Sequence, residues 1–123
     1  MIRQIERNIF FHILEISDIN FQKKIWFNYY PNYISSYREL MCSLFDDDNF
    51  LLFLDQYTTL LNYDEQFKNK LYSLYKKLIS FNSKDDLTDK QIIENKHWVI
   101  ISKYAKTIIK KWPNLAELLN NIN

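Results

Sequence analysis

The chain has 123 residues, a formal net charge of +1 and no glycine. Glycine enters left-handed backbone regions without steric cost, and phosphate-cradling loops, dinucleotide-binding turns and the nucleophile elbow all depend on it. The composition therefore excludes the most recognisable enzyme motifs. The near-zero net charge provides no bulk attraction to nucleic acid or to a membrane surface.

A chain of this length is most simply one domain, covering residues 1–123. Apolar residues make up 47% of it and aromatic residues 17%, enough for a substantial core and too much for disorder by low hydrophobicity. The single Cys42 cannot form an internal disulfide, which fits a reducing compartment. The N-terminus does not resemble a signal peptide, and no apolar run approaches the ~20 residues of a membrane span. We expect a cytoplasmic protein with no membrane partner.

Apolar residues in the first quarter of the chain follow helical spacing. Isoleucines recur at intervals of three and four and predict a first helix over residues 3–17. A second helix is predicted to carry Phe21, Ile25 and Tyr29. Pro31 interrupts it, because the residue before a proline is pushed toward an extended backbone.

The next segment predicts two shorter helices. Ser36 and Glu39 have the capping-box spacing and indicate the start of a third helix, which residues 46–49 interrupt. Another short helix is predicted from the apolar spacing over residues 50–61. Asn62 is expected to end it in a left-handed conformation, which asparagine tolerates better than most residues.

The second half of the chain holds the longest apolar stripes. One helix is predicted over residues 64–81, followed by a loop over residues 82–86. A second capping box at residues 88–91 indicates a further helix. The last long stripe covers residues 98–112, and Pro113 is expected to open a terminal turn or helix.

Strand patterns are missing from this sequence. No segment shows a convincing alternation of apolar and polar residues, and the absence of glycine rules out Asn-Gly hairpin turns. We therefore predict an all-α, compact single-domain bundle of about six or seven helices with non-parallel packing.

Residue types that carry catalysis or bind metals are scattered. His12 and His97 are far apart, and neither has a second His or Cys at ligand spacing. His12 fits a boundary position, and Cys42 fits core packing inside an amphipathic helix. We expect no metal, no cofactor, no catalytic residue and no small-molecule substrate, so the chain is not expected to be an enzyme. A small enzyme that uses coupled carboxylates stays a third hypothesis.

A basic stripe supports an alternative function. Lys103, Lys106 and Lys110 fall on one helical face, with Tyr104 and Trp112 nearby. Such stripes can hold phosphates and stack bases. Lysines on an outer helix face are usually only solvated, and the charges of the whole chain nearly cancel. We therefore expect no nucleic-acid partner, and keep a nucleic-acid-binding or regulatory helical protein as the alternative hypothesis.

A run of three aspartates, which we call the acidic corner, is more informative about function than the lysine stripe. Three adjacent carboxylates repel one another, so they are expected to cap the following helix or to face a cationic partner. One residue suffices for capping, which leaves two for a partner protein. The candidate charged contacts are Asp46, Asp47 and Asp48. Candidate aromatic anchors lie around Pro31, namely Tyr29, Tyr30 and Tyr33.

Several of these segments together resemble a known group of proteins. Residues 21–26 end in a tryptophan, Tyr30-Pro31 follows, residues 35–47 close in Phe-Asp-Asp, and a later tryptophan precedes an alanine in residues 97–105. This order resembles small bacterial immunity proteins, including those of contact-dependent growth inhibition and related uncharacterised families. The resemblance implies a cytoplasmic protein that binds and neutralises one cognate toxin domain, often a nuclease, without catalytic residues. We take this as the leading hypothesis.

Overall fold

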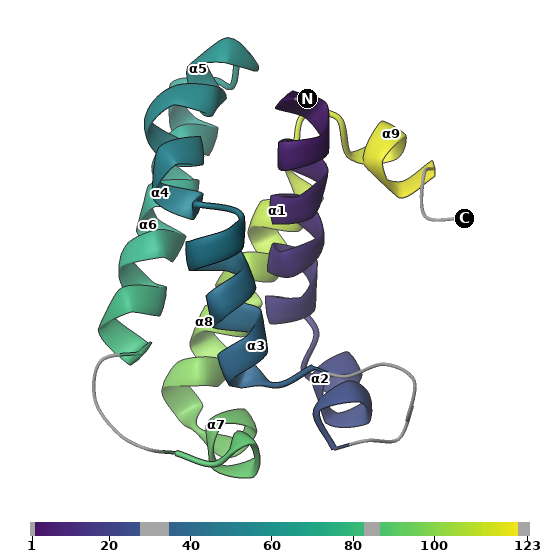
Figure 1. The fold of residues 1–123 in the computed structure, drawn as a ribbon, viewed down its shortest axis with the longest axis vertical. Helices are drawn as coiled ribbons and strands as arrows, with labels where there is room; N and C mark the ends of the chain where they lie inside the picture. Colours follow the sequence, from purple (N-terminus) through teal and green to yellow (C-terminus); the bar gives the residue numbers. More distant parts are fainter. Residues whose placement is uncertain (1, 28–34, 83–86, 121–123) are drawn as a thin grey trace.

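A computed structural model describes residues 2–27, 35–82 and 87–120. Every regular element in these ranges is helical, and the elements pack into one compact domain (Figure 1). The predicted all-α single-domain bundle is confirmed. The described residues form eight continuous helical segments, slightly more than the six or seven predicted. One reason is Asn95, whose extended backbone (φ −75°, ψ 128°) separates two helices.

The first helix matches its predicted position, and the second carries Phe21 and Ile25 but ends at Trp26, before the predicted Tyr29, which lies outside the described residues. Helix α1 (Ile2–Ile16) carries the isoleucine stripe, and α2 (Ile19–Trp26) follows after a tight turn. The side chain of Asp18 caps α2 by accepting a hydrogen bond from the backbone N–H of Phe21 at 3.0 Å. This cap satisfies one of the free N–H groups at the start of the helix.

Two helical segments in the middle of the chain contain π-helical turns. Helix α3 (Tyr37–Cys42) continues directly into the π-helical turn η1 (Ser43–Asp47). The next segment joins α4 (Phe50–Leu52), a second π-helical turn η2 (Phe53–Tyr57) and α5 (Thr58–Leu60). π-Helical turns are rare in proteins overall, and many of those that occur lie at functional sites.

The breaks around these segments fall close to the predicted ones. The third helix runs on through Asp46 and Asp47, so its interruption lies at Asp48 and Asn49, two residues later than predicted. Asn62 has φ 60° and is the predicted left-handed terminator. Asn49 has φ 48°, so a second asparagine takes a role that glycine usually fills.

The last four helices form the rest of the bundle. Helix α6 (Glu65–Asn82) and helix α8 (Lys96–Lys110) are the long ones, and they pack against each other. Helix α7 (Asp89–Glu94) begins with the predicted capping box, in which Thr88 and Gln91 bond each other's backbone N–H groups. Helix α9 (Leu115–Asn120) closes the described chain.

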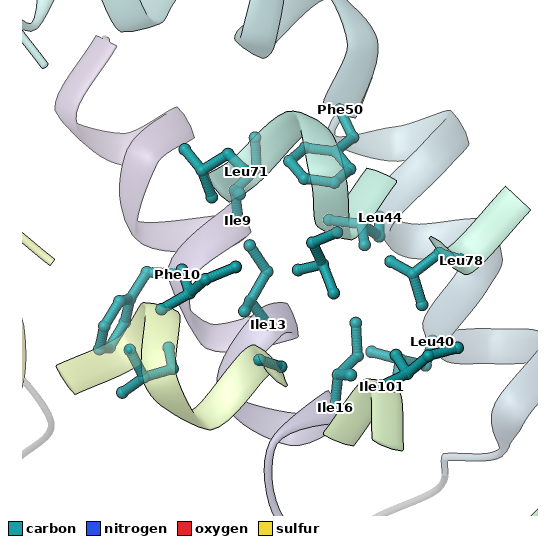
Figure 2. Close-up of a cluster of buried hydrophobic side chains, with 14 of the residues drawn as sticks. Ile9, Phe10, Ile13, Ile16, Leu40, Leu44, Phe50, Leu71, Leu78 and Ile101 are labelled. Carbon is teal, nitrogen blue, oxygen red and sulfur yellow. The ribbon is translucent and has the colours of Figure 1, made fainter. Parts of the chain in front are cut away.

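The core lies between α1, α3, α6 and α8. Helices α1, α6 and α8 run along the long axis of the molecule, and the shorter helices lie around them (Figure 1). Figure 2 shows side chains from these elements meeting in the interior, among them Ile9, Ile13, Leu40, Leu44, Leu71 and Leu78. Full burial of each such side chain stabilises the fold by about 1.5–3 kcal/mol. No helix in the described ranges combines the length and apolarity needed to cross a membrane.

All three tryptophans are buried, and each indole N–H reaches a polar acceptor inside the protein. Each acceptor belongs to α1 or α2, although two of the tryptophans lie in or after α8. The pairs are Trp26 with Glu15 Oε2 (3.0 Å), Trp98 with Gln22 Oε1 (3.0 Å) and Trp112 with Glu6 Oε2 (3.2 Å). The N-terminal helix pair therefore carries the acceptors that orient the large aromatic side chains of the core.

Glu6 is the most connected of these acceptors. Its side chain is fully buried, and Oε1 accepts from Arg3 Nη1 at 3.0 Å and from Asn114 Nδ2 at 3.2 Å. Oε2 accepts from the Tyr63 hydroxyl as well as from Trp112. Burial, and then the bond to Glu6, raise the pKa of Tyr63 far above its ordinary value, so the hydroxyl stays a donor.

Replacing Glu6 by alanine should destabilise the fold strongly. The change strips three buried or half-buried donors of their acceptor, at an expected cost of about 3 kcal/mol or more in the free energy of unfolding. Urea unfolding followed by circular dichroism measures this. The control is Glu65→Ala, which removes an exposed ion pair with Lys68 and should cost under about 1 kcal/mol. Equal losses in the two variants would contradict the role assigned to Glu6.

Candidate binding surface

The three aspartates of the acidic corner are not equivalent. The side chains of Asp46 and Asp47 are exposed at the end of η1. The side chain of Asp48 is only 6% exposed, and its Oδ2 pairs with Nδ1 of His12 on α1. Asp48 is therefore removed from the candidate partner contacts, because its carboxylate is already held inside the protein.

Local backbone geometry explains this division. The π-helical turn closes with a bond from the backbone N–H of Asp48 to the carbonyl of Ser43, at 2.8 Å. Asn49 then takes the left-handed conformation and caps α4 through its side chain, which accepts from the N–H of Leu52 at 3.3 Å. Asn49 therefore caps α4, and the side chain of Asp48 bonds to His12 instead. Asp46 and Asp47 are left facing solvent.

The elements that adjoin the acidic corner add an apolar residue and a third exposed acid. Helix α4 packs against η1, and Leu51 on α4 is 43% exposed. Asp55 lies one helical turn further on, is exposed, and accepts a hydrogen bond from the Tyr72 hydroxyl of α6. We call Asp46 and Asp47, with Leu51 on the adjoining helix α4, the acidic surface, and Asp55 lies further along on η2. Leu51 and Asp55 were not among the predicted partner contacts, although their i, i+4 spacing after the aspartate run was a readable signal.

The predicted tyrosine anchors lie elsewhere in the chain. Tyr29, Tyr30 and Tyr33 fall outside the described residues, so their role stays a prediction. Phe27, two residues before Tyr29, is 38% exposed at the end of α2. An exposed aromatic ring is thus present at the entry to this segment.

The other residue types considered for chemistry do not gather. Among the described residues, no three His, Cys, Asp or Glu side chains lie close enough together to hold a metal ion. His12 takes the predicted boundary position. The prediction for Cys42 is wrong: the thiol is exposed, because Leu40 and Met41 occupy the inward face of α3.

The lysine stripe lacks one of its two predicted stacking residues. Lys103, Lys106 and Lys110 are exposed on α8, as the pattern indicates. Trp112 is buried against the Glu6 network and cannot stack on a base. The Lys77 ammonium already lies over the half-buried ring of Tyr104, 5.0 Å from its centroid. Of the two aromatic residues predicted beside the lysines, only Tyr104 is thus left for the stacking that single-stranded nucleic acids use.

Removing the His12 side chain should lower the stability of the fold, whereas removing the Asp47 side chain should not. His12→Ala leaves the nearly buried carboxylate of Asp48 unpaired, which we expect to lower the free energy of unfolding by about 2 kcal/mol. Asp47→Ala removes an exposed side chain and should change it by under about 0.5 kcal/mol. Denaturant unfolding of both variants provides the comparison. If His12→Ala were as stable as Asp47→Ala, the pair would not anchor the corner.

The Tyr72 hydroxyl should titrate at a higher pH than an ordinary tyrosine, mainly because of its hydrogen bond to Asp55. The hydrogen bond to Asp55, then burial, raise the pKa of Tyr72 to about 12. Since this folded-state pKa lies above the unfolded value of about 10, the stability linked to the group is full below pH 10 and is lost as the pH rises from there toward 12. Tyrosine ring NMR signals followed against pH measure the pKa. Asp55→Asn should move it toward 10, Asp47→Asn should leave it unchanged, and the same pKa in both variants would refute the assigned cause.

Comparison of the chain with protein-family models, with curated proteins and with solved structures finds no significant match.

Proposed function

We propose that this protein is a non-enzymatic immunity protein, which binds and neutralises a cognate bacterial toxin domain by direct contact in the cytoplasm. The observation that carries the proposal is the exposed pair Asp46 and Asp47 at an anchored corner of the bundle, where the adjoining helix α4 carries the exposed Leu51. The order of motifs that resembles immunity proteins points the same way.

Charge supports this reading of the corner. A nuclease toxin needs a basic surface for its substrate, and neighbouring carboxylates on an inhibitor can approach such a surface favourably. The net charge of +1 does not oppose this, because salt screens exposed charges beyond about 8 Å and a partner therefore meets the local group of acids. Leu51 adds apolar area that can be buried beside the charged contacts.

Rigidity supports it as well. Asp48 ties the end of η1 to α1 through His12, and Asn49 caps the following helix. The backbone that directly follows Asp46 and Asp47 is thereby held in place. A preorganised surface loses less conformational freedom on binding, which leaves more of the interaction energy for affinity.

The alternative, a nucleic-acid-binding or regulatory protein that uses Lys103, Lys106 and Lys110, has weaker support. The exposed lysines are available, but Trp112 is buried and the ring of Tyr104 already contacts Lys77. Retention on DNA or RNA at low salt that falls as salt rises would favour this alternative.

The decisive experiment starts from the gene immediately upstream. The proposal expects it to encode a large secreted protein that ends in a small toxin domain. Co-expression of this chain should rescue cells from that domain, and the two proteins should co-purify. Failure of both rescue and co-purification with such a domain would overturn the proposed function.

Charge reversal then tests the surface. Asp46→Lys/Asp47→Lys should weaken toxin binding by about tenfold or more, since opposed charges replace complementary ones. The matched control is Glu65→Lys/Glu94→Lys, which makes the same change in net charge at two exposed positions on α6 and α7. Biolayer interferometry gives both affinities, and circular dichroism checks the folds. Equal affinities in the two double variants would eliminate the acidic surface while leaving the toxin partner itself unaffected.

A further inference from the structure

A second feature, which does not rest on the proposed function, lies where α6 ends and α8 begins. There the surface is hollowed to a volume of about 550 Å³. Small-molecule sites in proteins have volumes of about 300–1,000 Å³, so the size suits a ligand of moderate length. None of its lining residues belongs to the acidic surface.

The walls of the hollow combine apolar and cationic groups. Phe81 from α6 and Ile100 from α8 provide apolar surface, and Ile100 is 58% exposed although it is a large apolar side chain. Lys76 and Lys77 line the α6 side, and His97 lines the α8 side. No acidic side chain lines the hollow among the described residues.

These polar groups are available to a ligand to different degrees. Lys76 is exposed, and within the described ranges it pairs with no carboxylate. The ring of His97 makes no hydrogen bond to any described residue, and its backbone N–H donates to Asn95 Oδ1. Lys77 lines the hollow and is half-buried, and its ammonium lies 5.0 Å from the centroid of the neighbouring Tyr104 ring.

We propose that this hollow binds a small amphipathic anion, of the class of medium-chain carboxylates. The carboxylate meets Lys76 and Lys77, and the hydrocarbon chain covers Phe81 and Ile100. This pairing removes the exposed area of Ile100 from water and gives the lysines a counter-charge. A neutral ligand would satisfy only the apolar half of the site, and an inorganic anion only the cationic half.

The probe for this site is decanoate, titrated into the isotope-labelled full chain and followed by NMR. We expect saturable shifts at Ser80, Asn95 and Ile100, with a dissociation constant below about 1 mM. Decan-1-ol should bind more weakly than decanoate, because it lacks the charge. Absence of saturable shifts at these residues would overturn the proposal.

Two double variants separate a site from general charge attraction. Lys76→Glu/Lys77→Glu should weaken decanoate binding by about tenfold or more, the loss expected for charge-assisted contacts. Lys103→Glu/Lys106→Glu makes the same charge change on α8 at positions that do not line the hollow, and should leave binding within about twofold. Ile100→Asp, at an exposed position, tests the apolar wall and should also abolish binding. Equal losses in the two double variants, or full binding by Ile100→Asp, would refute the site.

Discussion

The burial of the Glu6 carboxylate is the constraint on which the rest of this structure depends. A buried carboxylate is costly unless hydrogen bonds replace its water, and four side chains do so here. Three of them, Tyr63, Trp112 and Asn114, come from far along the chain. The network can form only when the segment after α5 and the end of α8 both reach the start of α1. It therefore specifies a single arrangement of these elements, which apolar packing alone would define less sharply.

The position of the acidic corner depends on the position of α1 in this arrangement. The same helix carries Glu6 and His12, so fixing α1 in the bundle also fixes the partner of Asp48. Asp48 then holds the end of η1, and the two preceding aspartates face solvent. The buried polar network fixes helix α1, α1 fixes the hydrogen-bonded pair of His12 and Asp48, and this pair positions the proposed contacts.

The net charge conceals this spatial arrangement. At +1 the chain offers no overall field, yet Asp46 and Asp47 lie together at the end of η1 while Lys76 and Lys77 border the hollow between α6 and α8. Exposed charges act over a range of about 8 Å at physiological salt, so each group is felt by a partner separately. A protein with almost no net charge can in this way carry two surfaces that attract partners of opposite charge.

The amino-acid sequence by itself determined the features whose causes are local. Apolar residues at intervals of three and four predicted the helices, the Thr88 capping box predicted the start of α7, and Asn62 predicted a left-handed helix end, since each depends only on neighbours within about one turn. Only the tertiary structure decided which polar residues are buried. Glu6 lies on the same face as Ile2, Ile9 and Ile13, and this placement signals burial, but its partners stand up to 108 residues away. The same holds for Asp48, whose partner is 36 residues distant, and for Cys42, because contact with remote segments decides which side of a helix is covered.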